Sequence, residues 1–261
     1  MPIPVLPTPV PAAAREHDPL EERTVRQEVL LDGRFIKILR EEVKLPDDSD
    51  SMRVFLTHPG AAGILVLYPD GTVLLERQWR HPLKRSFWEI PAGKLDPNEP
   101  DLDCAKRELK EECGVTAAKW TSLGVLHNAI GYSSERIAIF LAEDPTEGEQ
   151  ALDEGEFLEC WRVPFEEALA MAEDGRITDV KTITALFRAD RIVRRRGAKA
   201  ATRKPQTADD RGDEGTAASL SGRTRSREDR LPSALFDGGR IRNHARALPR
   251  PRAALCGGGR G

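Results

Sequence analysis

Residues 93–115 read GKLDPNEPDLDCAKRELKEECGV, a loop that leads into a helical pattern. Between Asp101 and Cys113, apolar residues recur at helical spacing and form a narrow stripe made by Leu102, Ala105 and Leu109. Gly114 follows at the position where helices commonly end in a left-handed cap. This stretch therefore predicts a helix over Asp101–Cys113 that packs one face on a hydrophobic core.

Three carboxylates occupy a further face of this expected helix. Glu108, Glu111 and Glu112 are spaced i, i+3 and i+4, so their side chains project close together. Like charges at this spacing repel each other by a few tenths of a kcal/mol per pair, which favours a bound cation between them. Taken alone, the helix also fits an ordinary solvated surface, because Arg107 and two lysines lie close by.

The residues around the acidic face complete a longer pattern. It runs Gly93, five residues, Glu99, seven residues, and then Arg107-Glu108-Leu109-Lys110-Glu111-Glu112-Cys113-Gly114-Val115. This string resembles the signature of the Nudix hydrolases, Gly-x5-Glu-x7-Arg-Glu-aliphatic-x-Glu-Glu-x-Gly-aliphatic, at every specified position. The resemblance implies the Nudix α/β/α sandwich with a mixed β-sheet. The alternative is a Nudix-like fold that has lost catalysis, although every acidic position is intact.

The resemblance also implies a metal site suited to diphosphate hydrolysis. Glu108 and Glu112 are expected as the principal ligands, Glu111 as a further ligand or a polariser of metal-bound water, and the backbone carbonyl of Ala92 as an additional donor. The expected ion is Mg²⁺, with Mn²⁺ as the alternative, because hard cations take oxygen ligands and leave room for phosphate and water. Such an ion neutralises the diphosphate and lowers the pKa of the attacking water.

The other signature residues are expected to be structural. By the same resemblance, Glu99 and Arg107 would pair and hold the loop on the helix. Gly93 and Gly114 would serve the backbone conformation, since glycine reaches geometries that other residues avoid. None of these four residues is expected to carry chemistry itself.

Segments before the signature resemble the ADP-ribose pyrophosphatase branch of the family. Residues 76–80 (ERQWR) and 87–96 (FWEIPAGKLD) are similar to its Arg-Gln-Tyr-Arg-like strand and its Glu-Leu-Pro-Ala-Gly run. Arg80 would then contact the diphosphate through paired hydrogen bonds, and Glu89 the nucleotide or the terminal ribose. Arg34 could also reach the substrate. A solvated strand-end arginine and a loop carboxylate bonded to backbone are the alternatives for Arg80 and Glu89.

The loop at residues 128–136 departs from that branch. Ile130 stands where the branch usually has the proline of a Ser-Pro-Gly-like loop. This departure favours other nucleoside diphosphate sugars, such as GDP-mannose, relative to ADP-ribose. Glu135 in the same loop is expected to bind substrate or a metal-bound water, with a plain loop role as the alternative.

An acidic loop at residues 152–157 supplies candidates for the catalytic base. Its sequence, LDEGEF, contains a glycine and precedes an expected strand, so it could close on the site and exclude water. Glu156 is the first candidate and Glu154 the second. The alternative is a solvated acidic turn.

The rest of the chain predicts an α/β (α+β) domain. Hairpin signals at Asp32-Gly33 and Asp70-Gly71 are flanked by strand-like segments at 25–31, 34–43, 62–68 and 72–78. Further strands are expected at 54–58, 86–90, 120–127, 137–141 and 157–163, and further helices at 164–173 and 179–195. We expect a helix packed on a mixed sheet, preceded by an antiparallel N-terminal hairpin region.

Composition separates this domain from two tails. The chain has 261 residues and a formal charge of −3, yet residues 197–261 carry 14 basic and 7 acidic residues, which leaves −10 for the rest. Residues 1–20 contain six prolines. We expect a disordered Pro-rich leader at 1–20, the domain at 21–196 and a disordered Arg/Gly-rich tail at 197–261. Such tails bury too little apolar surface to offset the entropy lost on ordering.

Composition also bears on location and partners. No run approaches the roughly 20 apolar residues of a membrane span, and no secretory signal is expected at the N-terminus. Four cysteines without CxxC spacing predict a reducing, cytoplasmic compartment. No nucleic-acid partner is expected from the overall charge, although the basic tail keeps a nucleic-acid contact as an alternative.

The branch resemblance completes the functional expectation. It implies a homodimer whose N-terminal strands help to form the partner's substrate site, and cleavage of ADP-ribose to AMP and ribose 5-phosphate. The alternative from a different class is a non-catalytic Nudix module that senses a nucleotide sugar.

Overall fold

The computed structural model describes residues 18–202, with side chains described up to Arg196. The predicted leader, apart from residues 18–20, and the predicted tail beyond Thr202 lie outside the described residues. All described residues belong to one unit of the chain, Met1–Gln206. Within residues 18–202, every helix is too short or too polar to cross a membrane.

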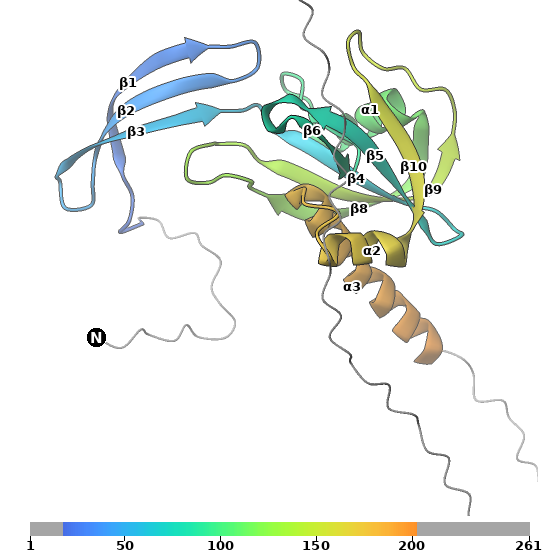
Figure 1. Ribbon diagram of the computed structural model, residues 1–261. Helices are drawn as coiled ribbons and strands as arrows, with labels where there is room; N and C mark the ends of the chain where they lie inside the picture. Colours follow the sequence, from blue (N-terminus) through green and yellow to red (C-terminus); the bar gives the residue numbers. More distant parts are fainter. Residues whose placement is uncertain (1–17, 203–261) are drawn as a thin grey trace, which may run out of the picture. The chain divides into compact units, whose positions relative to one another are not determined.

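The N-terminal strands form a three-stranded antiparallel sheet in the order β1-β2-β3 (Figure 1). Its members are β1 (Arg23–Asp32), β2 (Lys37–Lys44) and β3 (Asp50–Thr57). The predicted antiparallel hairpin region is therefore confirmed. β2 begins three residues later than predicted because the turn is wider than two residues: the Gly33 N–H donates to the Ile36 carbonyl at 2.9 Å.

A larger, mixed sheet carries the rest of the fold. Its main path runs β10-β5-β4-β9-β8, with β6 paired to β5 and β7 paired to β4. The β4–β9 pair is parallel, whereas the other pairs are antiparallel. The strands are β4 (Ala61–Leu67), β5 (Thr72–Arg80), β6 (Arg85–Glu89), β7 (Ala92–Lys94), β8 (Val115–Leu126), β9 (Ile137–Glu147) and β10 (Leu158–Pro164).

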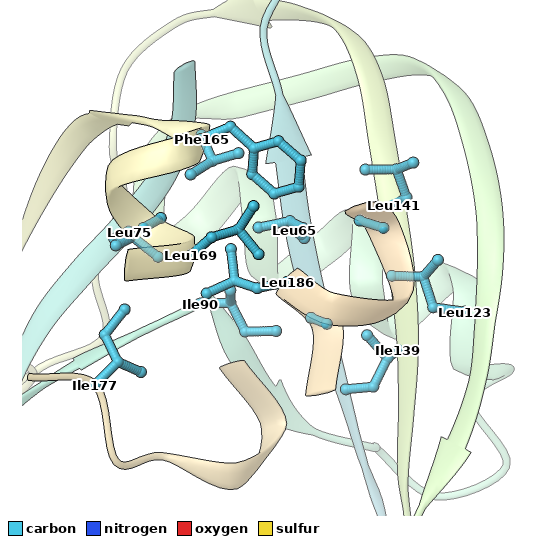
Figure 2. Packing of buried hydrophobic residues seen from close by; sticks show 14 of the residues in the cluster. Leu65, Leu75, Ile90, Leu123, Ile139, Leu141, Phe165, Leu169, Ile177 and Leu186 are labelled. Carbon is cyan, nitrogen blue, oxygen red and sulfur yellow. The ribbon is translucent and has the colours of Figure 1, made fainter. Parts of the chain in front are cut away.

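Helices cover both faces of this sheet, as a Nudix sandwich requires. α1 (Asp101–Cys113) has the predicted bounds, and Leu109 packs with Ile64 and Val66 of β4 in one core cluster. α2 (Phe165–Glu173) and α3 (Val180–Thr202) lie on the other face, where Leu65 of β4 belongs to a second cluster (Figure 2). Since successive β4 side chains point to opposite faces and both faces are covered, nearly the whole strand is buried. The expected α/β (α+β) class is confirmed.

Several boundaries differ from prediction. β7 and a short 3₁₀ helix at His81–Leu83 were not expected, β3 and β8 begin earlier, and β9 continues to Glu147. α3 continues to Thr202, six residues into the segment predicted to be disordered. The alanine-rich residues 198–201 have high helix propensity and extend a helix that packing has already nucleated.

Candidate active site

β7 and α1 bring the signature glycine and an acidic side chain into direct contact. A Cβ atom placed on Gly93 would lie 1.8 Å from the carboxyl carbon of Glu108 and 1.9 Å from its Oε1. Real Cβ atoms do not approach other atoms so closely, and only glycine leaves this space to the carboxylate. Gly93 therefore positions Glu108, a more specific task than the general conformational one predicted for it.

Arg107 links the loop to the helix, in agreement with the geometry expected of a structural pair. Its Nε donates to Glu99 Oε1 at 2.9 Å and its Nη2 donates to Glu99 Oε2 at 2.8 Å. Hydrogen bonds from Arg107 lower the pKa of Glu99 to about 2. Arg107 Nη1 also donates to Glu108 Oε1 at 2.8 Å and to Glu111 Oε2 at 3.1 Å. At the other end of α1, Gly114 has the predicted left-handed conformation, with φ at 64°.

Glu112 lies deepest in the acidic cluster. Its side chain is buried, and its Oε2 accepts a hydrogen bond from the Ala92 N–H at 2.9 Å. Burial, together with repulsion from Glu108 and Glu156, raises the pKa of Glu112 to about 8. Burial also raises the pKa of Glu108. For both carboxylates burial is the largest cause and outweighs the cations that act in the opposite direction, Arg107 on Glu108 and Lys181 on Glu112.

Sequence reasoning missed Glu76, a buried carboxylate on β5. It is fully buried, and neither of its carboxylate oxygens has a hydrogen-bond partner among the described residues. Burial, and then the charge of Glu112, raise its pKa well above the ordinary value. Glu76 pairs in register with Glu89 on one side and with Cys160 on the other, so this part of β5 is interior to the sheet.

The donor set of this cluster fits a hard divalent cation. Glu108, Glu111 and Glu112 offer only oxygen atoms, the ligands that Mg²⁺ prefers, and the Ala92 backbone lies against Glu112. In residues 18–202, however, no three His, Cys, Asp or Glu side chains are gathered closely enough to hold an ion as they stand. Arg107 Nη1 instead donates hydrogen bonds to both Glu108 and Glu111. A cation would replace the guanidinium as their partner.

The loop before β10 brings one of the two base candidates to the cluster. Glu156 is partly buried, its Oε1 lies 3.5 Å from Gln78 Nε2, and its charge helps to raise the pKa of Glu112. Glu154 is exposed in the same loop. Of the two candidates, Glu156 is thus the one whose charge acts on Glu112.

A cavity of about 530 Å³ lies next to the acidic cluster and is lined by residues of both charges. Arg80 and Glu89 both line it, and Arg80 donates two hydrogen bonds to Glu89, at 2.7 and 2.6 Å. Although burial acts in the opposite direction, Arg80 and Lys181 lower the pKa of Glu89. Arg80 is thus not a free strand-end arginine, and Glu89 is bonded to side chains and not to the backbone of a loop.

The start of α3 forms another wall of the cavity, which sequence reasoning also missed. Lys181 is buried and forms ion pairs with Glu89 and with Asp179, the latter at 3.1 Å. Burial would lower the pKa of Lys181, but Asp179 and Glu89 outweigh it and raise the value. Thr182 Oγ1 accepts a hydrogen bond from the Ile90 N–H at 2.8 Å. These contacts attach α3 to the turn that carries Ala92.

Of the two loop residues predicted to contact substrate, Glu135 lines the cavity and Arg34 does not. Glu135 lines the cavity, where its Oε2 accepts a hydrogen bond from Asn128 Nδ2 at 3.0 Å. Arg34 is exposed and is not among the cavity's lining residues. Its neighbour Phe35 lines the cavity instead, with Lys94 Nζ 5.2 Å from the centre of its ring. The late start of β2 leaves Arg34 in the turn, which explains this difference.

Comparison with known proteins agrees with the site. The family model described as the NUDIX domain matches residues 57–186. An ADP-ribose pyrophosphatase of Bacillus subtilis is 38% identical over 169 residues, which cover 64% of this chain and 91% of that protein. A GDP-mannose pyrophosphatase of Yersinia enterocolitica is 34% identical over 171 residues, covering 60% of this chain and 89% of that protein.

Among solved structures, an ADP compounds hydrolase has a similar fold. The TM-score is 0.61 at 22% sequence identity, with 68% of this chain and 96% of that chain covered. This likeness of fold, the family match and the B. subtilis relative agree with the intact signature at residues 93–115, and the chain therefore belongs to the Nudix hydrolase family.

Proposed function

We propose that this Nudix hydrolase uses Mg²⁺ to hydrolyse the diphosphate of ADP-ribose or a related nucleoside diphosphate sugar, with AMP and ribose 5-phosphate as products from ADP-ribose. One observation carries the proposal. A buried acidic cluster with raised pKa values adjoins a cavity lined by Arg80, Lys94 and Lys181. The acidic cluster suits cations, and the cavity with its basic residues suits the anionic diphosphate of a nucleotide. The cavity's volume, about 530 Å³, is in the range of small-molecule sites.

Each part of the cluster has a proposed task. Glu108, Glu112 and the Ala92 carbonyl would hold the cation, and Glu111 would be a further ligand or would orient water. A bound divalent ion neutralises diphosphate charge and activates water for attack. Arg107 keeps Glu108 and Glu111 in place before the ion arrives. Glu156 is the proposed base that accepts the proton of the attacking water, with Glu154 as the second candidate.

The cavity residues would bind the substrate. Arg80 is the proposed contact for the diphosphate, since its planar guanidinium suits paired bonds to phosphate oxygens. Glu89 orients Arg80 through two hydrogen bonds and faces the same cavity. Glu135 lies on the opposite loop and would contact the sugar or a bound water.

GDP-mannose is the second candidate substrate. The departure at Ile130 favours it, and a relative 34% identical over 171 residues is named a GDP-mannose pyrophosphatase. A panel of ADP-ribose, GDP-mannose, diadenosine polyphosphates and NADH, each assayed with Mg²⁺, Mn²⁺ and chelator, tests the proposal. We expect ADP-ribose to give the highest kcat/KM. Binding without turnover for every compound would indicate the non-catalytic sensing module.

The proposed assembly is a homodimer. All ten residues of β1 are exposed, and Val29, Leu30 and Leu31 form an apolar run on it. An exposed edge strand of this kind is a ready surface for a second chain. Light scattering measured as the protein elutes from a size-exclusion column would distinguish a dimer from a monomer. We further propose a cytoplasmic location, because the described cysteines are free thiols.

A further inference from the structure

Two thiols from distant parts of the chain meet beside the C-terminal end of α1. Cys113 is the last residue of α1, and Cys160 lies on β10, 47 positions later. Their Sγ atoms are 3.3 Å apart. A disulfide bond has an S–S length of about 2.05 Å, so the two atoms need to approach by little more than about 1 Å.

The two thiols are also accessible. Cys160 is exposed and Cys113 partly exposed, and both are free. Cys104, in contrast, is fully buried on α1, where its Sγ lies 3.5 Å from the Lys94 carbonyl oxygen. An oxidant in solution can therefore reach the pair Cys113 and Cys160 without unfolding the domain, whereas Cys104 is shielded.

The pair adjoins the proposed metal ligand Glu112. Cys113 follows Glu112 in the chain, and Cys160 Sγ lies 3.6 Å from the Glu112 carbonyl oxygen. Gln150, from the loop that carries Glu156, donates a hydrogen bond to the same carbonyl. The thiol pair therefore contacts both the end of α1 and this loop.

We propose that Cys113 and Cys160 are an oxidative modification site, where a peroxide forms an intramolecular disulfide that lowers the activity of the enzyme. The Cys160 sulfur attacks one peroxide oxygen and the O–O bond breaks, giving a sulfenic acid and water. The Cys113 sulfur then attacks the Cys160 sulfur, the S–O bond breaks, and the S–S bond forms with release of a second water. Two thiols are oxidised, and one hydrogen peroxide is reduced to two waters.

The disulfide would act on catalysis through geometry. It joins the C-terminal residue of α1 to β10, the strand that follows the Glu154–Glu156 loop, and so shifts Glu112 relative to that loop. Misplacement of a reacting group by about 1 Å can cost on the order of 10²-fold in rate. We expect a drop in kcat of at least about tenfold, fully reversed by dithiothreitol. Only this effect, and not formation of the disulfide, rests on the proposed function.

The test uses the full chain, which has four cysteines, after reduction and removal of reductant. Treatment with hydrogen peroxide should remove two titratable thiols from the denatured protein, lower its mass by two hydrogen atoms, and join the peptides of Cys113 and Cys160. Turnover of ADP-ribose is measured before oxidation, after oxidation and after dithiothreitol.

Matched variants identify the pair. Cys160→Ser should keep its thiol count and its kcat after peroxide, whereas Cys256→Ser, at a position outside the described residues, should respond as the wild type does. A disulfide to Cys104 or Cys256, or no loss of thiols, would overturn the site. A Cys113–Cys160 disulfide that leaves kcat unchanged would overturn its effect on activity. If ADP-ribose is not a substrate, the thiol count and the peptide map still decide whether the disulfide forms.

Discussion

Replacing Gly93 by alanine tests the link between the signature glycine and the acidic cluster. The added Cβ would lie 1.8 Å from the carboxyl carbon of Glu108 and 2.3 Å from its Oε2. Ordinary carbon–carbon contacts begin near 3.5 Å, so the carboxylate has to retreat by about 1.5 Å or more. The carboxylate is the far end of the flexible Glu108 side chain, and it can move without displacing the backbone. The variant should therefore fold, with Glu108 out of place.

The expected loss follows from that displacement. An error of about 1 Å in a reacting group can cost on the order of 10²-fold, which corresponds to about 2.7 kcal/mol in the activation free energy. We expect kcat/KM for ADP-ribose to fall by about 10²-fold in Gly93→Ala. The Mg²⁺ concentration for half-maximal activity should rise as well, because Glu108 is a proposed ligand. Both quantities come from initial rates over a Mg²⁺ titration.

Gly131→Ala is the matched control. Gly131 is exposed, and a Cβ added there meets no atom within 4 Å. This variant should keep the wild-type kcat/KM and Mg²⁺ dependence, and thermal unfolding should show both variants folded. A folded Gly93→Ala enzyme with wild-type kcat/KM and Mg²⁺ dependence would refute the reasoning, since Glu108 would then not need its observed position.

Other variants probe the rest of the site. Glu112→Gln should lower Mg²⁺-dependent turnover at least about 10²-fold with the fold intact by circular dichroism, and near-normal rates would remove Glu112 from the proposed ligands. Lys181→Met should lower the free energy of unfolding in urea by about 3–5 kcal/mol, because Glu89 and Asp179 lose their buried cation. Lys181→Arg keeps a cation there and should lower it less. Equal losses in the two variants would contradict the ion-pair explanation. Truncation after Thr202 should leave kcat and the melting temperature unchanged, and a large loss of either would show that the omitted segment stabilises the domain. Without metal, the melting temperature should fall as the pH rises from 4.5 to about 8, because the folded state binds the Glu112 proton more tightly than the unfolded chain does. Added Mg²⁺ should then raise the melting temperature more at pH 8 than at pH 6. Equal rises at the two pH values would contradict the raised pKa of Glu112.

The bounds of helices and strands were predicted best where the residues that determine them lie within the same short segment. The bounds of α1 were correct because its apolar stripe and Gly114 are both encoded within the segment itself. β7 was missed because its three residues become a strand only through pairing with β4, and nothing in their own sequence indicates it. The start of β2 was predicted at residue 34, three residues too early, for a related reason. The Asp32-Gly33 signal indicates a turn, but not that the turn extends to Ile36.

The same limit applies to the site. The family signature names Glu108 and Glu112, but Lys181 lies about 70 positions further along the chain, and its pairing with Glu89 follows from tertiary packing. The available signal was weak: Asp179 caps α3, accepting the Thr182 N–H at 3.0 Å, which marks a helix start and not a substrate wall. In the sequence, Glu76 is only a polar position on an expected strand. Its burial becomes visible only when β4 and β10 are placed beside β5.

Charge divides the proposed site into two halves that behave differently before any ligand binds. In the basic half, Arg80 and Lys181 are already paired with Glu89 and Asp179, so their charges are compensated within the protein. In the acidic half, burial and repulsion between carboxylates raise the pKa values of Glu112 and Glu108, and Lys181 and Arg107 offset this only in part. Cation binding should therefore precede productive binding of a diphosphate, because the incompletely compensated carboxylates would otherwise repel it. Residues 1–196, with a formal charge of −10, can bind an anionic substrate on this account, provided that the metal ions are counted as part of the site.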